Sequence, residues 1–336
     1  MFSHKRLIAE FEDQSFTQII FPHAATDWAP YLDEAQTTFI DIINTIIQFQ
    51  KCLVICDNVE NVQRHFSPNK NLFFIQYLTD DTWARDTSAL CINNEENTTT
   101  LLDFTFNAWG NKFTATKDNA MSRALQKCYK APMQSIDFVL EGGGIESNGE
   151  DTLLTTTTCM LNPNRNPDLN NIEITNQLKE YFGAKHILYL NHGYLAGDDT
   201  DSHIDTLARF INADTIMYVE CSDKDDEHYH QLQLMKEELQ MIAKERSLNL
   251  IALPLPDAIY YDNERLPATY ANFLFVNNAV LVPVYNVKQD KKALEIFQKT
   301  FPYKEVVPID SSILIRQHGS LHCVTMNFAA TVGLSC

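Results

Sequence analysis

A cysteine near the C-terminus could act as a nucleophile. Cys323 follows a Gly319-Ser320 pair and lies at the mouth of a β-prone run that includes Thr325. We expect backbone freedom at Gly319 to allow a turn that brings the Cys323 thiol to a cleft. The alternative is an unreactive thiol that is buried as a small apolar side chain. Neighbouring strand residues point to opposite faces, so a base for Cys323 has to come from elsewhere than His322.

A histidine and a carboxylate at close spacing are candidates for partners of this thiol. His203 and Asp205 stand at positions i and i+2, which share a face in extended structure. An imidazole and a carboxylate would then face one pocket. The alternatives are a hydrogen-bonded surface or core histidine and a solvated acidic loop over residues 198–205.

The same residues raise the question of a metal. Histidine and aspartate at this spacing can bind zinc, but zinc bound with a cysteine thiolate normally has further cysteine or histidine ligands, and none is patterned here. His228 and His230 lie among acidic residues at the start of a predicted helix, which favours a solvated face. We therefore predict neither a metal nor a cofactor.

Further loops carry unusual polar content. They are Asp81-Thr82-Trp83-Ala84-Arg85-Asp86, Glu141-Gly142-Gly143-Gly144 and Pro267-Ala268-Thr269-Tyr270-Ala271-Asn272. Each has a structural alternative: Asp86 could pair with Arg85, Trp83 could belong to the core, and the glycines could form a turn or bulge. The glycines lack the GxGxxG pattern, so a phosphate-binding loop is not expected.

The elements that would position these loops repeat in one order. Each of five predicted helices is followed at once by a short apolar strand: 34–51 by 52–56, 117–131 by 135–140, 171–182 by 186–190, 225–246 by 248–254, and 289–301 by 304–309. A polar loop follows each pair, and the segment 1–33 is predicted to be irregular. Fixed repetition favours a propeller or solenoid, although ordinary α/β folds also alternate helix and strand. No Gly/Ser-rich linker divides the chain, so we predict a single domain over residues 1–336.

Composition limits the possible partners and the location of the protein. The formal net charge is -18 and the sequence pI is near 4.9, which argues against nucleic-acid or anionic-membrane partners. Eight cysteines without CxxC pairs suit a reducing compartment. Residues 1–11 lack the apolar region of a signal peptide, and no run approaches the ~20 apolar residues of a membrane helix. A cytoplasmic protein is predicted.

Taken together, the loops resemble a known family. The matching segments are DTWARD (81–86), FNAWG (106–110), EGG (141–143), LLTT (153–156), LNPNRNP (161–167), His203-x-Asp205 and His322-Cys323. In this order they are similar to agmatine deiminases, which belong with the bacterial type of peptidylarginine deiminase in the guanidine-modifying (pentein) superfamily. The resemblance runs from about residue 80 to residue 328. It implies a five-bladed α/β propeller of ββαβ-type repeats with the active site on its axis.

The resemblance also implies roles for individual residues. Cys323 matches the nucleophile, His203 the general acid/base, and Glu141 the carboxylate that orients His203. Asp86 and Asp205 match the carboxylates that bind the guanidinium group. The implied reaction is hydrolysis of agmatine to N-carbamoylputrescine and ammonia through an amidino-thioether on Cys323, within putrescine and polyamine biosynthesis. The implied partner is a small cationic guanidine, and no cofactor or metal is required.

Residues further from the nucleophile are less well matched. Trp83 is expected to contact the substrate, and Asp199 is expected to hold its distal ammonium group. Relatives commonly carry Glu at the position of Asp199, Thr-Asn-Gly where this chain has Thr200-Asp201-Ser202, and Gly-Gly-Asn near residues 318–321. These departures leave the proposed catalytic groups unchanged and concern the way the far end of the substrate is held.

Two other functions remain open from the sequence. A peptidylarginine deiminase would need a group to hold peptide backbone or a C-terminal carboxylate, for which Arg123, Arg165 and Arg265 are available. A non-catalytic pentein binding protein would have no chemical reason to keep the catalytic residues together. Assembly as a homodimer is a further expectation.

Overall fold

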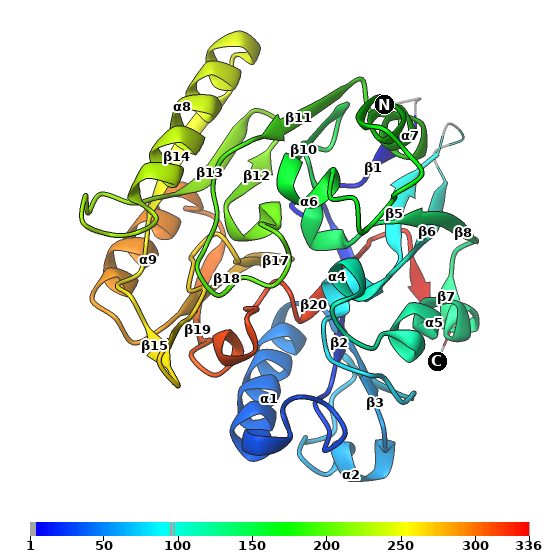
Figure 1. The fold of residues 1–336 in the computed structure, drawn as a ribbon. Coiled ribbons are helices and arrows are strands. Elements are labelled where there is room, and N and C mark those ends of the chain that lie inside the picture. The colour runs from blue at the N-terminus through cyan, green and yellow to red at the C-terminus, as the bar shows by residue number, and fades with distance from the viewer. Residues whose placement is uncertain (1–4, 95, 97, 336) are drawn as a thin grey trace.

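The fold is a mixed α/β arrangement in which one order of elements recurs. The computed structural model describes residues 5–94, 96 and 98–335 (Figure 1). In each repeat two antiparallel strands are followed by a helix and by a third strand, which pairs in parallel with the second. Parallel strands need such a crossover, because a short turn cannot return the chain in the same direction.

The sheet that joins the two ends of the chain contains β20 (Thr325–Ala329), β2 (Gln14–Ile20), β3 (Lys51–Cys56) and β4 (Leu72–Gln76), with α1 (Leu32–Phe49) between β2 and β3. The next contains β1 (Arg6–Leu7), β5 (Leu90–Asn93), β6 (Thr99–Thr105) and β8 (Met133–Val139), with α5 (Thr116–Ala124) before β8. The third contains β9 (Glu146–Ser147), β10 (Thr152–Thr156) and β11 (His186–Leu190), with α7 (Asn171–Phe182).

Two further sheets have the same order. One contains β12 (Ala208–Asn212), β13 (Thr215–Glu220), α8 (Tyr229–Arg246) and β14 (Asn249–Pro254), and the other contains β17 (Leu274–Val276), β18 (Ala279–Val284), α9 (Gln289–Thr300) and β19 (Glu305–Asp310). Small two-stranded sheets are formed by β15 (Tyr260–Tyr261) with β16 (Glu264–Arg265), and by β7 (Tyr129–Lys130) with β21 (Gly333–Leu334). Short helices are α2 (Val59–Gln63), α3 (Ala84–Thr87), α4 (Ala108–Asn111) and α6 (Thr157–Met160), with 3-10 turns η1 (Ala29–Tyr31), η2 (Gln126–Cys128), η3 (Gly142–Gly144), η4 (Ile204–Thr206) and η5 (Leu314–Gln317).

The predicted helix–strand pairs are confirmed, most closely at α7. This helix spans the predicted residues, because Asn170 and Glu173 form a capping box at its start and Gly183 ends it with φ of 61°. The predicted helix over 117–131 ends earlier, at Ala124. Tyr129 instead joins β7 and stacks on Phe328, with ring centroids 5.2 Å apart.

The prediction that residues 1–33 are irregular is wrong for β1 and β2, while residues 1–4 lie outside the described part. Strand β2 is an inner strand of its sheet, paired with β20 on one side and β3 on the other. Its polar side chains obscured the strand pattern. In the structure they are buried and hydrogen-bonded: Gln18 donates to Ser88, and the Tyr129 hydroxyl donates to Gln18.

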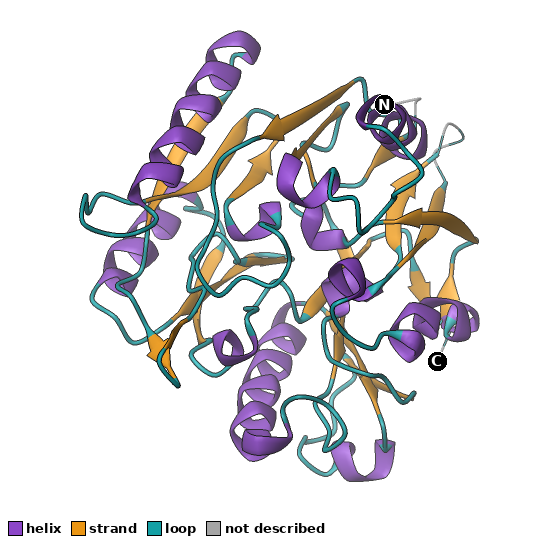
Figure 2. Cartoon of the chain, in the orientation of Figure 1, coloured by secondary structure: helices purple, strands orange, loops and turns teal. Residues whose placement is uncertain are grey.

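The long helices lie at the periphery and the strands and loops lie inside them (Figures 1 and 2). Helix α1 buries one apolar face, formed by Ala35, Phe39, Ile42, Ile43, Ile46 and Ile47. Besides their own sheets, α1 contacts β19, α9 contacts β14 and α8 contacts β11. Each of these helices therefore bridges its own sheet and the last strand of the sheet next to it.

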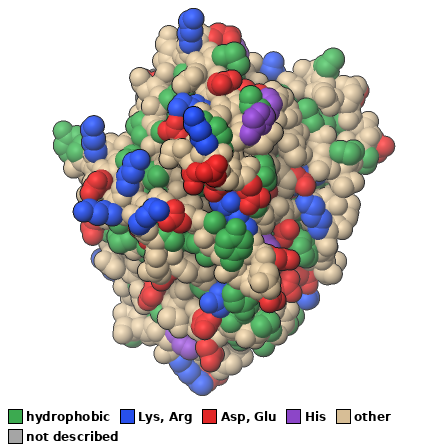
Figure 3. Space-filling model, turned by 60° about the vertical axis from the view of Figure 1, so that its left-hand side comes forward, with side chains coloured by type: hydrophobic (Ala, Val, Ile, Leu, Met, Phe, Trp, Pro, Cys, Tyr) green, Lys and Arg blue, Asp and Glu red, His purple; other side chains and the backbone are tan. Residues whose placement is uncertain are grey.

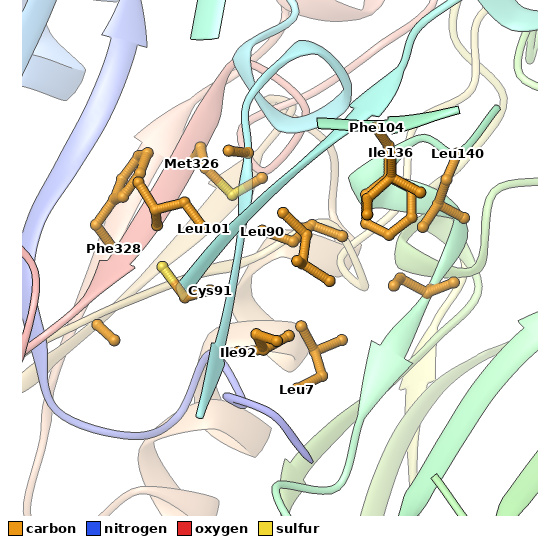
Figure 4. Close-up of a cluster of buried hydrophobic side chains, with 14 of the residues drawn as sticks. Leu7, Leu90, Cys91, Ile92, Leu101, Phe104, Ile136, Leu140, Met326 and Phe328 are labelled. Carbon is orange, nitrogen blue, oxygen red and sulfur yellow. The ribbon is translucent and has the colours of Figure 1, made fainter. Parts of the chain in front are cut away.

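Hydrophobic clusters fill the space between the sheets. One of them combines strand side chains from β5, β6 and β8 with Met326 and Phe328 of β20 (Figure 4). Strands distant in sequence thus share one core, and the loops that leave them are held at fixed separations.

Charged and apolar side chains share the surface. On the face drawn in Figure 3, acidic and basic side chains lie interspersed with apolar ones. Among the residues that the structure describes, no helix combines the length and the apolar character that a membrane span requires.

Candidate active site

The three residues matched to catalytic roles and the two carboxylates matched to guanidinium binding lie together, although they come from four separate loops. Asp86 belongs to α3, Glu141 directly precedes η3, His203 directly precedes η4, which contains Asp205, and Cys323 lies in the turn before β20. All five are buried. His203 Nδ1 lies 3.7 Å from Asp86 Oδ1, and Cys323 Sγ lies 3.8 Å from Asp205 Oδ2. The imidazole and the thiol therefore each contact one carboxylate of a buried pair.

Gly143 allows these groups to approach one another. A Cβ atom at this position would lie 2.7 Å from His203 Nδ1, 2.9 Å from Asp86 Oδ1 and 3.1 Å from Asp205 Oδ2. The Gly143 N–H donates to Asp86 Oδ1 over 2.9 Å. The glycine run after Glu141 thus provides close packing and one backbone donor.

The prediction of extended structure around His203 is wrong. Residues 204–206 form a 3-10 turn, and Asp201 and Ser202 before it have φ of 67° and 64°. His203 and Asp205 nevertheless reach the same cluster, because both are packed around Gly143. Ser202 adopts this left-handed φ at a higher cost than a glycine would.

The surroundings of His203 favour its protonated form. Burial lowers the pKa of His203, but the charge of Asp86, the adjacent Cys159 and the carboxylate of Glu141 outweigh it and raise the pKa well above its ordinary value. Glu141 Oε2 lies 3.9 Å from His203 Nε2. A protonated imidazole can serve as a general acid.

Arg165 orients Glu141. Its Nε donates to both Glu141 oxygens, over 3.0 and 2.8 Å, and its terminal nitrogens donate to Asp201 and to the Thr200 carbonyl. Burial alone raises the pKa of Glu141, but His203 and Arg165 bring it below its ordinary value. Arg165 was considered only for binding a substrate carboxylate; the structure gives it this role in the loop around His203 instead.

Cys323 is buried next to negative charge. Burial, followed by the charges of Asp205 and Asp86, raises the pKa of the Cys323 thiol well above its ordinary value. Asn272 opposes this, since its Nδ2 donates to Cys323 Sγ over 3.3 Å. Asn272 lies in the predicted polar loop 267–272, but its amide gave no separate signal in the sequence.

The turn before Cys323 differs from the expectation in one respect. The residue with a left-handed φ is His318, at 65°, and not Gly319. A Cβ at Gly319 would lie 2.1 Å from a ring atom of Trp83. Glycine is therefore needed here for the close approach of the Trp83 ring.

A second cysteine, Cys159, was missed as a member of the site. Ligand atoms of Glu141, Cys159 and His203 lie within 4.8 Å of one another, so these residues could in principle hold a metal. Arg165 already binds Glu141, and the raised pKa of His203 makes protons compete for its ring nitrogens. The surroundings of Glu141 and His203 therefore suit hydrogen bonds and ion pairs better than they suit a bound metal.

Trp109, within the FNAWG segment, binds Asp86. Its Nε1 donates to Asp86 Oδ2 over 2.9 Å. Residues 108–111 all have positive φ, from 53° to 88°, so the segment labelled α4 is a left-handed turn. The Asn107 side chain stabilises it by accepting from Gly110 N and donating to the Asn164 carbonyl. Such backbone strain is typical of functional sites.

A pocket of about 150 Å³ leads to Cys323. It is lined by Asp27, Asp81, Trp83, Asp86, Trp109, Phe113, Asp199, Thr200, Gln317, His318, Gly319 and Cys323. Four of these side chains are carboxylates, and none of these described lining residues is Lys or Arg. The pocket is suited to a cation with apolar methylene groups between its charged ends.

The two residues expected to contact the far part of a substrate both line this pocket. Trp83 Nε1 donates to Asp81 Oδ2 over 2.9 Å, so the indole presents its ring rather than its N–H. Burial raises the pKa of Asp81 to about 7. The Asp199 side chain is 44% exposed, with Oδ2 3.9 Å from His318 Nε2, and burial raises its pKa. Asp81 thus adds a carboxylate that had not been singled out.

Known proteins share both the sequence and the structure. The family model of Porphyromonas-type peptidyl-arginine deiminase matches residues 6–328. A putative agmatine deiminase of Legionella pneumophila (strain Paris) is 33% identical over 299 residues, which cover 88% of this chain and 86% of the relative.

Solved structures agree. A C. jejuni agmatine deiminase variant with substrate bound is 42% identical, with a TM-score of 0.92 and 96% of each chain covered. The crystal structure of a putative peptidyl-arginine deiminase is 44% identical, with a TM-score of 0.93, covering 98% of this chain and 99% of the other. An amidinotransferase from Microseira wollei, 11% identical with a TM-score of 0.52, shares the fold alone, covering 97% of each chain. The chain belongs to the Porphyromonas-type peptidyl-arginine deiminase family.

Proposed function

We propose that this protein is an agmatine deiminase, a hydrolase of C–N bonds in linear amidines. One observation carries the proposal: the His203 imidazole and the carboxylates of Asp86 and Asp205 are packed around a single glycine, and the buried Cys323 thiol contacts Asp205. A guanidinium group is a planar cation that donates on all sides, so two carboxylates can bind it bidentately and place its carbon beside the sulfur.

The pocket favours agmatine over a peptidyl-arginine substrate. Agmatine has a guanidinium, a short alkyl chain and an ammonium, and the lining carboxylates Asp199, Asp81 and Asp27 are available for the ammonium. The arginines considered for a substrate carboxylate are engaged elsewhere: Arg165 with Glu141, Arg123 with Asp103 and Arg265 with Asp226. The C. jejuni relative, an agmatine deiminase with substrate bound, supports the same assignment.

The reaction has two halves. The bound guanidinium offsets the negative charge of Asp86 and Asp205, which lowers the cost of ionising Cys323, and the thiol proton passes to the solvent. The thiolate attacks the guanidinium carbon, a C–S bond forms, and the C–N bond to the departing ammonia breaks as His203 supplies its proton. Water, deprotonated by the now neutral His203, then attacks the amidino-thioether. The C–S bond then breaks, N-carbamoylputrescine leaves, and the hydroxyl proton of the tetrahedral intermediate passes to the sulfur, which restores the thiol.

The recurring ββαβ order and the bridging helices support a five-bladed α/β propeller formed by one catalytic domain over residues 1–336. The carboxylate-lined pocket supports a small cationic guanidine as the partner. The cytoplasmic location, the homodimer and the place in polyamine biosynthesis stay predictions.

The test is ammonia release from agmatine, free arginine and a peptide with C-terminal arginine, measured side by side. Agmatine is expected to be the best substrate, with an adduct on Cys323 detectable by mass spectrometry after quenching. Cys323→Ser should abolish turnover. The control Cys221→Ser should remain active, because Cys221 is buried in a hydrophobic cluster with side chains of α8. Faster release from the peptide would overturn the substrate, and residual turnover above a few per cent in Cys323→Ser would overturn the covalent mechanism.

A further inference from the structure

His322, next to the nucleophile in sequence, belongs to a buried charge network behind the site. Its Nδ1 lies 2.7 Å from Asp205 Oδ2, and its Nε2 lies 2.5 Å from Glu10 Oε2. The side chains of His322, Asp205 and Glu10 are at most 9% exposed. His322 and Glu10 are not among the residues that line the substrate pocket, whereas Asp205 contacts Cys323, which is one of them.

Glu10 is held in place by several groups. Its Oε2 lies 3.0 Å from Arg85 Nη2 and 3.1 Å from Arg209 Nη2, and its Oε1 accepts the Phe275 N–H over 2.8 Å. Arg209 also pairs with Glu146. Burial raises the pKa of Glu10, but His322, Arg209 and Arg85 bring it well below its ordinary value, so Glu10 is ionised.

The His322 ring lies between two carboxylates of this network, because Nδ1 faces Asp205 and Nε2 faces Glu10. The guanidinium groups of Arg85 and Arg209 also contact Glu10. A buried carboxylate oxygen needs a donor, and Nδ1 is the atom that supplies one to Asp205 Oδ2.

Asp205 has one oxygen that is held and one that is available. Oδ2 accepts from His322 Nδ1, whereas Oδ1 is buried without a hydrogen-bond partner among the residues that the structure describes. A buried carboxylate oxygen without a donor is unfavourable until a ligand supplies one. A guanidinium N–H has the required chemistry.

We propose that His322 is a positioning residue: fixed by Glu10, it holds Asp205 by Oδ2 so that Oδ1 is free to receive the guanidinium of the substrate. The proposal rests on the proposed function, because it concerns the binding of that substrate. His322 acts through Asp205 and is not itself a catalytic residue.

Two amide variants of His322 separate its contact with Asp205 from its contact with Glu10. An asparagine at 322 carries its amide nitrogen on Cγ, as Nδ1 is carried, and can still donate to Asp205. A glutamine carries its nitrogen one bond further, as Nε2 is, and can donate to Glu10 but not to Asp205. His228→Gln is a matched control, because His228 is a buried histidine 2.8 Å from Asp226 that lies outside the site.

We expect His322→Gln to raise KM for agmatine between about tenfold and about a hundredfold, because Asp205 loses the bond that orients it. His322→Asn should keep KM within about threefold of the wild type, and His228→Gln should leave it unchanged. Equal KM values for the asparagine and glutamine variants would overturn the proposal.

A pH profile separates positioning from general damage. Burial raises the pKa of Asp205, but the hydrogen bond and charge of His322 lead the effects that bring it below its ordinary value. The other ionisable groups facing it are His203, Arg209, Cys323 and Asp86. Without the His322 donor the acid limb of kcat/KM should move to higher pH in His322→Gln and not in His322→Asn. An identical limb in both variants would contradict the proposal.

A measurement on the wild-type protein covers the case in which His322→Gln does not fold. In ¹⁵N-histidine-labelled protein, His322 Nδ1 should carry the proton that is donated to Asp205, with the ring signals assigned by their loss in His322→Asn. A ring without a proton on Nδ1 would overturn the proposal. Because this result does not depend on turnover, it stays informative if agmatine proves not to be the substrate, which wild-type ammonia release decides separately.

Discussion

Adding a single methyl group at Gly143 should disrupt the site without unfolding the protein. In Gly143→Ala the new Cβ would lie 2.7 Å from His203 Nδ1 and 2.9 Å from Asp86 Oδ1. Ordinary contacts begin near 3.4 Å, so the imidazole has to retreat by about 0.7 Å and the carboxylate by about 0.5 Å. Overpacking of this kind costs about 1–3 kcal/mol of stability.

The catalytic loss should exceed the loss of stability. Misplacement of a reacting group by ~1 Å can lower the rate ~100-fold, equivalent to ~2.7 kcal/mol in the activation barrier. We therefore expect kcat/KM for agmatine to fall by about two orders of magnitude, measured by ammonia release over a range of substrate concentrations. Thermal unfolding should show a cooperative transition with a slightly lower midpoint.

Gly333→Ala serves as the control. A Cβ there would meet the flexible Lys130 side chain at 3.1 Å, far from the site in the β7–β21 sheet. Its kcat/KM should match that of the wild type. If Gly143→Ala stayed within about threefold of the wild type, the three groups could not be packed around this glycine as described.

Three further predictions concern the same pocket. Asp199→Asn should raise KM for agmatine about tenfold, equivalent to ~1.4 kcal/mol. It should leave kcat much less affected, since the contact with the distal ammonium is equal in the ground and transition states. An unchanged KM would remove Asp199 from the site. Trp109→Phe deletes the N–H donor to Asp86 and retains the ring packing. It should raise KM about tenfold, because a buried hydrogen bond to a charged group contributes ~1.5–3 kcal/mol. An unaltered KM would show that this donor is dispensable. The pKa of Cys323 is raised in the unliganded enzyme, so its thiol is expected to be neutral. Alkylation of Cys323 by iodoacetamide should therefore be slow at neutral pH and accelerate as the pH increases towards that pKa. A rate independent of pH between about pH 6 and 9 would contradict a neutral thiol.

The local pattern of the chain determined much of the fold. The boundaries of α7 follow from Asn170, Glu173 and Gly183, which act within a few residues of the helix. The strands β3 and β11 follow from short apolar runs, and the motifs singled out Cys323 and His203 as candidates for the site. These features depend on neighbouring residues, so one sequence suffices to predict them.

Other features depend on partners that are distant in sequence. Strand β2 contains Gln18, whose side-chain amide donates to Ser88 and accepts from the Tyr129 hydroxyl. The left-handed turn at 108–111 is held by Asn164. Local propensity opposes both features, and only the packed structure stabilises them.

In the candidate site, too, some features depend on local sequence and others on partners that are distant in the chain. The residue types that do the chemistry were evident from the sequence, but their electrostatic surroundings were not. Arg165 reaches Glu141 from another loop, and Glu10 contacts His322 across 312 residues of chain. The charge on a buried group depends on every dipole and ion around it, whatever their distance along the chain. The sequence therefore determined which groups could react, and the tertiary structure alone decided which partners set their protonation and direction.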